Sequence, residues 1–365
     1  MKKKILIFMP SIEGGGVEKN LFIISNFLTK KYKDINLITT SKEYKKKFIN
    51  IKIISPKFNL SNQSRKIKYL FCLYELFKML IKRENVLIIS FQANLYCILI
   101  AKLFRKKILV RSNSSPSGWS KNFLKKILFK LILKFADTVV VNSIEFKKEF
   151  KKKFNLSAVN IYNPLNKEEI LKLSKKRISF PFFDKSKKSL KIINIARFTD
   201  QKDHFTLLRS ANVLKKNNIN FKLLIIGRGT NYKNMKNYIS KHKMSKMIKI
   251  LNFKNNPFPY LNKSDIFLLT SKFEGLPNVL LEALVLKKII ISTNCPTGPK
   301  EILQNGKLGF LCKVGDHMQI AKYIEQCMHK KKKINKIITR AYNSLDRFNY
   351  MKNLNKYYLE IEKLY

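Results

Sequence analysis

Short apolar runs alternate along the whole chain with longer segments whose apolar positions have helical spacing. The runs in the first half are residues 4–9, 35–40, 51–54, 86–90, 107–111 and 138–142. Those in the second half are residues 190–196, 221–227, 248–251, 265–270 and 287–293. Strands that alternate with helices are typical of a doubly wound parallel sheet. The pattern therefore predicts an α/β protein of two Rossmann-like domains that face a central cleft.

The domain boundaries follow from length and composition. The chain has 365 residues, more than one hydrophobic core usually serves. We expect an N-terminal domain over 1–166, a lysine-rich linker over 167–188 and a second domain over 189–340. The last segment, 341–365, is expected to be a helix that crosses back to the first domain.

The chain is strongly basic, with a formal net charge of +52. Such an excess points to phosphates, nucleic acid or anionic lipid. Of the 75 basic residues 65 are Lys and only 10 are Arg, whereas readers of nucleic acid rely on Arg for bidentate contacts, so we expect no nucleic-acid partner. The codon bias of an A/T-rich genome explains much of the lysine. The charge would still attract the protein to an anionic membrane surface.

Signals for export or membrane insertion are weak. The N-terminal apolar run stops at Pro10, too early for a signal peptide, and no stretch reaches 18 uncharged apolar residues. The five cysteines show no C-x-x-C pair and no Cys/His ligand spacing, which indicates buried thiols of a reducing compartment and no metal site. We expect a cytoplasmic protein, with peripheral contact to the inner face of the cell membrane as an additional hypothesis.

Three motifs follow directly after predicted strands. The first is "GGG" at 14–16, before a helix expected to begin near Val17. Glycines let a backbone approach a ligand closely, and a helix N-terminus offers N–H groups to an anion. A tight strand-to-helix turn explains the same glycines without a ligand.

The second motif is "ARFTDQKDH", residues 196–204. It places Arg197 and Lys202 on a short loop before a helix expected at Asp203. A guanidinium fork and an ammonium group together would hold a diphosphate well. The alternative is a basic loop that is exposed to solvent and binds no ligand. This alternative has more weight for Lys202 than for Arg197.

The third motif is "SKFEGLPNVLLEAL", residues 271–284. Pro277 is expected near the first helical position, with Glu274 on the loop and Glu282 on the helix. Both carboxylates are able to project into one cleft, where they would accept hydrogen bonds from the vicinal hydroxyls of a sugar. The alternatives are a loop-capping Glu274 and an exposed helical Glu282.

These motifs resemble those of family 4 glycosyltransferases, which are retaining enzymes of the two-domain type called GT-B. "FEGLPNVLLEAL" is similar to the family's E-x7-E signature, "RFTDQK" to its Arg-and-Lys motif and "GGGVEKNLFIISNFL" to its glycine loop. "NCPTGPKEIL", residues 294–303, is similar to a following donor-side loop in relatives that build bacterial surface polysaccharides or lipid-linked oligosaccharides. The four motifs occur in the family's order across nearly the whole chain.

The resemblance implies that the domain over 1–166 is the acceptor side and that the domain over 189–340 binds the nucleotide sugar. It also implies a role for each matching position. Arg197 and Lys202 would hold the donor diphosphate, and Glu274 would contact the donor sugar. Glu282 would bind the ribose. The residues implied in donor binding are Gly15, Gly16, Arg197, Lys202, Gly275, Leu276, Asn278, Val279 and Glu282.

The implied reaction moves a hexose or N-acetylhexosamine from a nucleotide sugar, with UDP the expected nucleotide, to a glycan or lipid-linked acceptor. It would proceed with retention and need neither cofactor nor metal, because cations and a helix dipole stabilise the leaving diphosphate. Three alternatives stay open: an epimerase of the same fold, a catalytically silent homologue and a non-catalytic nucleic-acid-binding protein.

The first half departs from the family in one respect. Many relatives carry a histidine there, whereas all four histidines of this chain lie in the second half. Gln92, Asn94, Arg111 and Asn113 lie at expected strand ends and are polar candidates for sugar or acceptor contact, although capping and turn formation explain Asn equally well. Two basic, aromatic helices, 65–84 and 118–137, are candidates for membrane contact unless their apolar faces pack on the sheet.

Overall fold

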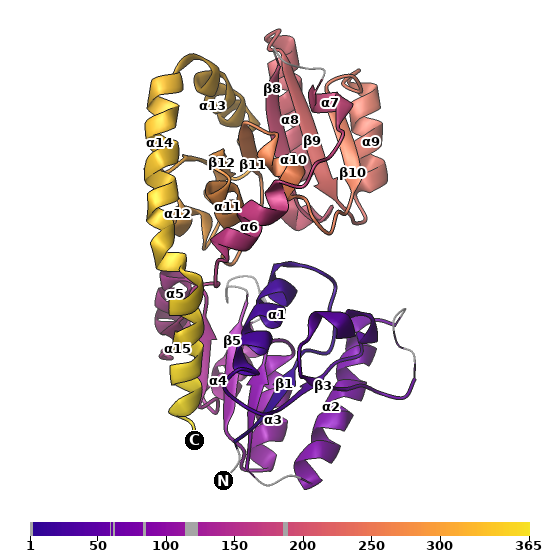
Figure 1. Ribbon diagram of the computed structural model, residues 1–365, viewed down its shortest axis with the longest axis vertical. Coiled ribbons are helices and arrows are strands. Elements are labelled where there is room, and N and C mark those ends of the chain that lie inside the picture. The colour runs from indigo at the N-terminus through magenta and orange to yellow at the C-terminus, as the bar shows by residue number, and fades with distance from the viewer. Residues whose placement is uncertain (1–2, 59, 61–62, 83–84, 114–122, 185–188) are drawn as a thin grey trace. The chain divides into compact units, whose positions relative to one another are not determined.

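The computed structural model describes residues 3–58, 60, 63–82, 85–113, 123–184 and 189–365. The chain forms two compact units (Figure 1). The first consists of Met1–Pro164 together with Tyr350–Tyr365, and the second of Leu165–Asn349. Within the described ranges, every helix is too short or too polar to cross a bilayer.

The first unit is built on a parallel sheet of seven strands in the order β3-β2-β1-β4-β5-β6-β7. The strands are β1 Lys4–Phe8, β2 Asp34–Ile38, β3 Lys52–Ile54, β4 Val86–Ser90, β5 Ile108–Ser112, β6 Thr138–Val141 and β7 Val159–Asn160. The six strands expected from the apolar runs are all present, and β7 was not predicted because it has only two residues.

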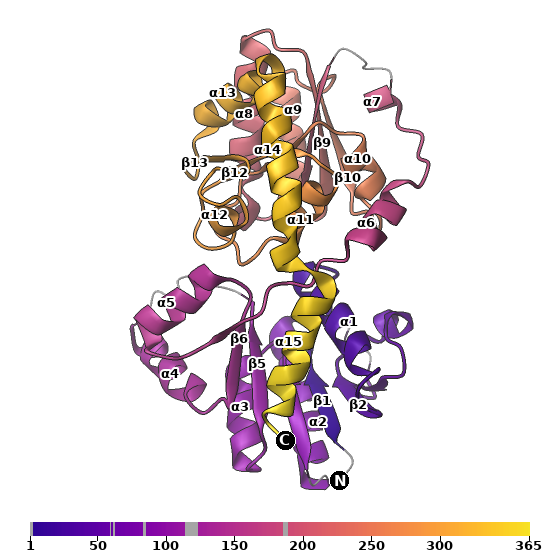
Figure 2. The same cartoon turned by 60° about the vertical axis from the view of Figure 1, so that its left-hand side comes forward.

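Helices cover both faces of this sheet. They are α1 Gly16–Leu28, α2 Arg65–Lys82, α3 Asn94–Leu103, α4 Phe123–Leu133, α5 Ile144–Phe154 and α15 Tyr350–Glu362, with a 3-10 helix at Lys42–Lys47. Because side chains alternate along a strand, Leu6 and Phe8 pack against α2 to α5, whereas Ile5 and Ile7 pack against α1 and α15. Figure 2 shows α15 alongside the strands of this unit. The predicted helix residues 83–84 and 118–122 lie outside the described residues.

The second unit has a parallel sheet of six strands in the order β10-β9-β8-β11-β12-β13. The strands are β8 Leu190–Ile195, β9 Phe221–Gly227, β10 Ile248–Asn252, β11 Ile266–Leu269, β12 Ile289–Thr293 and β13 Phe310–Cys312. The helices are α6 Lys167–Ser174, α7 Pro181–Asp184, α8 His204–Lys216, α9 Tyr232–Lys241, α10 Phe258–Asn262, α11 Asn278–Val285, α12 Pro299–Ile302, α13 His317–His329 and α14 Lys331–Asn343. Short 3-10 helices occupy Asp200–Lys202 and Ser344–Phe348. The predicted fold class, two doubly wound Rossmann-like units, is confirmed.

The segment predicted as a linker, 167–188, carries two helices of the second unit. The Asn166 side chain caps α6 by accepting a hydrogen bond from the Glu169 N–H, and Ile170 of α6 is buried. Phe183 of α7 is fully buried. The many lysines of this segment obscure these apolar anchors in the sequence. Residues 185–188 of the predicted linker lie outside the described residues.

The C-terminal segment is divided between two helices rather than forming one. The helix expected over 341–365 is replaced by the end of α14 at Asn343, the 3-10 helix and then α15. The chain changes units near Asn349, where Leu165 and Asn349 form an isolated parallel bridge. Here the Leu165 N–H donates to the Phe348 carbonyl at 3.0 Å.

Candidate functional site

Three of the sequence motifs lie on loops at one edge of the second sheet. They follow β8, β11 and β12, which are adjacent parallel strands. The carboxyl ends of parallel neighbours meet at the same edge, the usual ligand position in doubly wound sheets. The site is therefore built from loops 196–203, 270–277 and 294–298.

Hydrogen bonds join the first two of these loops. The Lys272 N–H donates to the Gln201 carbonyl at 2.8 Å, and the Gln201 side-chain amide donates back to the Phe273 carbonyl at 2.9 Å. The Thr270 hydroxyl donates to the Lys202 carbonyl at 3.0 Å. These three hydrogen bonds thus join motifs that are about 70 residues apart in the chain.

The third loop is fastened onto the second. The Thr297 hydroxyl donates to the Glu274 carbonyl at 2.5 Å, and the Glu274 N–H donates to the Pro296 carbonyl at 3.4 Å. Gly298 has a φ of +84°, and a Cβ atom there would lie 1.8 Å from the Gly275 carbonyl oxygen. Only glycine permits this approach.

A buried ion pair lies where the loops meet. The Lys202 Nζ atom is 2.5 Å from the Glu274 Oε1 atom, and the exposed fractions of the two side chains are 14% and 7%. The Ser271 hydroxyl donates to the same carboxylate oxygen at 2.6 Å. Since an ammonium group has three N–H donors, Lys202 keeps donors for a second acceptor. Glu274 likewise keeps its Oε2 atom, which accepts no hydrogen bond from the described residues.

Arg197 takes no part in this ion pair. Its side chain is exposed on the loop after β8 and makes no hydrogen bond to the residues that the structure describes. Arg197 and Lys202 lie on the same loop, as the sequence predicted. In the structure, however, the two side chains share no hydrogen-bond partner among the described residues. A guanidinium in this position is available to a ligand that approaches from solvent.

The N-terminus of α11 completes the site. Pro277 occupies the cap position with an extended backbone, φ −72° and ψ 106°, directly before the first helical residue, Asn278, and so near the position that the sequence predicted. The first N–H groups of a helix have no partner within the helix and favour an anion. The predicted phosphate-binding residues surround this start: Gly275, Leu276, Asn278 and Val279. Glu282 follows in the second turn of α11 and is buried, so its contact with a ribose stays a prediction.

A fourth loop, after β9, supports the first and was missed by sequence reasoning. A Cβ atom on Gly227 would lie 1.9 Å from the Ala196 carbonyl oxygen, and one on Gly229, where φ is +150°, would lie 2.5 Å from the Phe198 carbonyl oxygen. Between them Arg228 is exposed, with its guanidinium 5.0 Å from the centre of the Phe253 ring. The signal was available, because the apolar run 221–227 ends in Gly227 and Gly229 follows after one residue.

A buried histidine lies beneath the Lys202 loop. His204 is the first residue of α8, its ring packs edge-on against Phe198 with centroids 5.2 Å apart, and neither ring nitrogen has a hydrogen-bond partner among the described residues. Burial, with a contribution from Lys202, lowers the pKa of His204 to about 4, against an opposing effect of Asp203. This imidazole is therefore neutral at pH 7.

The glycine loop of the first unit leads into α1 as predicted, one residue earlier than expected. Gly15 caps the helix and Gly16 is its first residue, which is exposed. A Cβ atom on Gly15 would lie 2.8 Å from the Glu18 Oε2 atom, and Glu18 is buried at the start of α1. The close approach of Glu18 explains why residue 15 is a glycine. The contact of Gly15 and Gly16 with a donor stays a prediction.

The polar candidates of the first unit tie strand ends together. The Gln92 Oε1 atom accepts from the Ser11 N–H at 3.0 Å. Asn94 accepts from the Ser90 hydroxyl at 2.8 Å and donates to the Arg111 carbonyl at 3.1 Å. These contacts favour the structural interpretation of Gln92 and Asn94.

Arg111 is buried in the same unit among neutral acceptors. Its Nε atom donates to the Tyr357 hydroxyl of α15 at 2.8 Å and its Nη2 atom to the Asn163 Oδ1 atom at 2.6 Å. Its Nη1 atom donates to Asn113, whose own amide donates to the Phe91 carbonyl at 2.9 Å. Since Arg111 is only 1% exposed, it fastens α15 to the sheet rather than facing a ligand.

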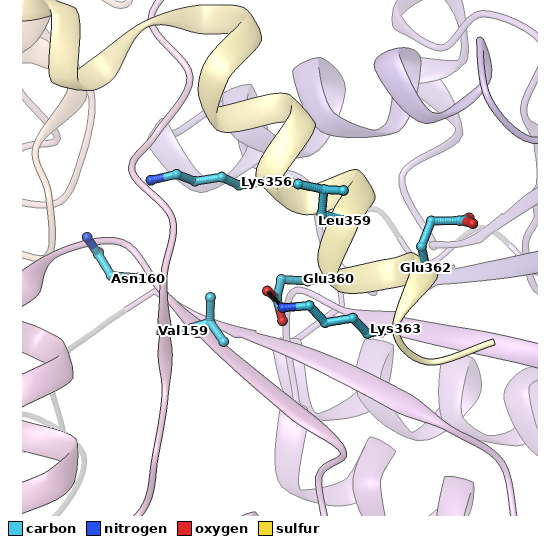
Figure 3. A pocket seen from close by; sticks show the side chains of 7 residues that line it. All are labelled: Val159, Asn160, Lys356, Leu359, Glu360, Glu362 and Lys363. Atoms are coloured by element: carbon cyan, nitrogen blue, oxygen red, sulfur yellow. Dashed lines mark hydrogen bonds and ion pairs between the residues drawn. The ribbon is translucent and has the colours of Figure 1, made fainter.

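A hollow of about 560 Å³ beside α15 belongs to the first unit and is a different feature (Figure 3). It is lined by Val159, Asn160, Lys356, Leu359, Glu360, Glu362 and Lys363. Its carboxylates already have cations: Glu360 pairs with Lys363 at 2.6 Å, and Glu362 pairs with Lys3 at 2.6 Å. We assign no ligand to this hollow.

Metal ligands are not gathered at these loops. Among the residues that the structure describes, no group of three or more His, Cys, Asp or Glu side chains is placed to hold an ion. The thiol of Cys295, in the third loop, is kept protonated because burial and the nearby Glu274 raise its pKa to about 12.

Comparison with known proteins defines the class. Residues 175–344, which carry the three loops, match the family model of glycosyl transferases group 1. The solved structure of Anabaena HepE in complex with UDP and glucose superposes with a TM-score of 0.79 at 16% identity and covers 99% of both chains. The resemblance to glycosyltransferases is confirmed: the second unit carries the group 1 family match, and the fold is the two-domain GT-B fold.

The chain is also similar in sequence to two curated proteins. The chain is 33% identical over 218 residues to an uncharacterized glycosyltransferase of Methanocaldococcus jannaschii, which covers 56% of this chain and 53% of that protein. It is 24% identical over 376 residues to a Campylobacter jejuni enzyme, N-acetylgalactosamine-N,N'-diacetylbacillosaminyl-diphospho-undecaprenol 4-alpha-N-acetylgalactosaminyltransferase. That match covers 98% of this chain and 100% of the relative.

Proposed function

We propose that this protein transfers a hexose or N-acetylhexosamine, with retention, from a UDP-sugar to a lipid-linked glycan in the synthesis of a cell-surface polysaccharide or glycoconjugate. The observation that carries the proposal is the arrangement of the three loops, which are joined by hydrogen bonds and contain the buried Lys202–Glu274 ion pair. The Campylobacter relative supports the acceptor, since its name specifies a diphospho-undecaprenol-linked glycan. The HepE structure supports UDP as the nucleotide.

The leaving diphosphate is the group for which the loops supply positive charge. Arg197 approaches it from the solvent side, Lys202 with its remaining N–H donors from below, and the N–H groups at the start of α11 add the helix dipole. In many enzymes, fixed dipoles and charges that stabilise a developing negative charge supply most of the rate enhancement. In this proposal these groups do the work that a metal does elsewhere.

Glu274 has two tasks in this mechanism. Its Oε1 atom holds Lys202 and Ser271 in place, and its Oε2 atom accepts a hydrogen bond from a hydroxyl of the donor sugar. The acceptor hydroxyl attacks from the side of the leaving diphosphate, and a departing phosphate oxygen takes its proton. The protein then contributes mainly positioning and charge.

The test is turnover with defined substrates. Purified protein is incubated with UDP-hexoses and UDP-N-acetylhexosamines and a diphospho-undecaprenol-linked glycan, in the presence of EDTA, and the new linkage is assigned by NMR. We expect an α-linked product from an α-linked donor. Glu274→Gln and Arg197→Ala should reduce turnover at least about 100-fold, whereas Arg209→Ala, an exposed arginine of α8, should leave it unchanged.

Three outcomes would overturn parts of this proposal. A β-linked product would contradict retention, and loss of turnover in EDTA would contradict metal independence. Conversion of the UDP-sugar without acceptor would indicate the epimerase of the same fold instead.

A further inference from the structure

Helix α2 of the first unit has two apolar sides. One faces the sheet, with Cys72, Leu76 and Leu80 buried in the core. The other faces solvent and consists of Ile67, Leu70, Tyr74, Phe77 and Ile81, which are exposed. These five follow at spacings of three and four, so they form one continuous stripe along the helix. A helix that only covers a sheet needs a single apolar side.

The next two helices repeat this arrangement. On α3 the exposed apolar residues are Tyr96, Leu99 and Leu103. On α4 and just beyond it they are Leu124, Ile127, Leu128, Leu131 and Phe135. Both helices also send other side chains into the same core as α2, Ile98 and Leu133 among them.

The three stripes lie on one face of the unit. Helix α2 packs against α3, and α3 packs against α4. All three cover the same face of the sheet, so their outward sides point away from the same core. Monomeric soluble proteins rarely expose contiguous apolar surface of this extent without a binding role. We call this surface, formed by the 13 exposed apolar residues named above on α2, on α3 and on or just beyond α4, the outer helix face.

The charge around the outer helix face indicates which partner it binds. Within the bounds of α2, α3 and α4 there are nine Lys or Arg residues and one acidic residue, Glu75, which pairs with Lys78 at 3.7 Å. Cations around an apolar surface complement an anionic bilayer, where apolar side chains enter the headgroup region and lysines remain at the phosphates. A second copy of this chain would bring the same cations face to face, which disfavours a dimer.

We propose that the outer helix face binds the surface of an anionic lipid bilayer. The first unit then lies flat on the membrane through three helices, none of which crosses it. The inference rests on the surface alone and goes beyond the proposed function, although it would place the protein where a lipid-linked acceptor is found.

The test is flotation with vesicles of phosphatidylcholine alone or with 30% phosphatidylglycerol, at low and high salt. We expect wild-type protein to bind the anionic vesicles at least tenfold more tightly than the neutral ones, with binding weakened by salt. The triple variant Leu70→Ser, Leu103→Ser, Leu124→Ser changes one highly exposed residue on each helix. It should bind at least tenfold more weakly than wild type with an unchanged melting temperature.

The matched control is Met318→Ser, Met351→Ser, Leu359→Ser, which removes three exposed apolar side chains elsewhere. It should bind like wild type. Equal binding by the two triple variants, or no binding of wild type to anionic vesicles at low salt, would overturn the proposal. Self-association in sedimentation that only the first variant abolishes, without vesicle binding, would assign the face to a second copy. UDP binding without vesicles reports separately on the proposed function.

Discussion

Each unit buries a cation near the carboxyl ends of its strands, and the two cations differ in their partners. Lys202 of the second unit pairs with a carboxylate, Glu274. Arg111 of the first unit has neutral acceptors, supplied by Tyr357, Asn113 and Asn163. Sequence reasoning made both candidates for ligand contact, Lys202 with the donor diphosphate and Arg111 with the sugar or acceptor.

The difference separates Lys202, the cation proposed to bind a ligand, from Arg111, which is structural. Lys202 lies on a loop, retains donors and is partly exposed, so a ligand is able to reach it. Arg111 is inside a strand, 1% exposed and bonded to the C-terminal helix. A buried guanidinium without a carboxylate is costly unless its donors are satisfied, which the three neutral side chains accomplish.

The surfaces of the two units differ as well. Of the 25 large hydrophobic side chains exposed in the described part of the chain, 13 lie on the outer helix face of the first unit, whereas six are scattered over the second. The second unit keeps its apolar side chains inside and presents polar loops. This contrast fits a donor-binding unit and a membrane-facing unit.

The largest expected effect is from Lys202→Met. It leaves Glu274 buried without its cation, which should cost about 4 kcal/mol of unfolding free energy and at least about 100-fold in turnover. Denaturant unfolding and the transferase assay measure the two effects. In the double variant Lys202→Met, Glu274→Gln stability should largely return and activity should not. If the single variant is as stable as wild type, the pair is not buried as described.

Protonation of His204 is expected to have the next largest effect. Its folded pKa of about 4 lies below the ordinary value of 6.5, so the unfolded chain binds the proton more tightly. The stability contributed by the neutral ring is fully present above pH 6.5 and is lost as the pH falls to 4, by about 3 kcal/mol. Unfolding between pH 7 and pH 4 measures it. His204→Leu should lose less stability over this range, and an identical profile would refute the assignment.

The contact between two loops is tested by a pair of glycines. Gly298 and Gly315 both have φ of +84°, but a Cβ atom would meet Gly275 only at the first, and nothing within 4 Å at the second. Gly315→Ala should cost about 1 kcal/mol from backbone strain, and Gly298→Ala about 2 kcal/mol more. Only Gly298→Ala should weaken UDP binding. Equal effects on stability and binding would show that the loops are not in contact.

The smallest effect is expected in the first unit. Tyr357→Phe removes one acceptor from the Arg111 guanidinium and should cost about 1.5 kcal/mol. UDP binding should not change, because Tyr357 belongs to the first unit. Tyr74→Phe, on the exposed stripe of α2, is the control and should be neutral. A Tyr357→Phe variant that lost UDP binding would give Arg111 a functional role after all.

The apolar pattern predicted most of the fold because the strands are buried on both faces and appear as continuous runs. Strands β7 and β13 were missed since two or three residues make no run. Helices α6 and α7 were hidden in a lysine-rich segment, where single anchors such as Ile170 and Phe183 carry the burial.

The site was predictable in its residues and not in its contacts. The motifs identified Lys202 and Glu274, but the hydrogen bonds that join their loops connect residues such as Gln201 and Phe273, which are 72 positions apart. No local pattern encodes such a pairing. The close approach of Gly298 to Gly275 is likewise a contact between two loops that are separate in the chain.

The central claim is that the loops after β8, β11 and β12 bind UDP, and calorimetric titration of UDP into the protein tests it most directly. The account predicts binding to wild type and to Arg209→Ala, and binding at least about tenfold weaker, or about 1.4 kcal/mol, to Arg197→Ala and to Glu282→Ala. Equal affinity of all four proteins for UDP would contradict it, as would the absence of binding to wild type.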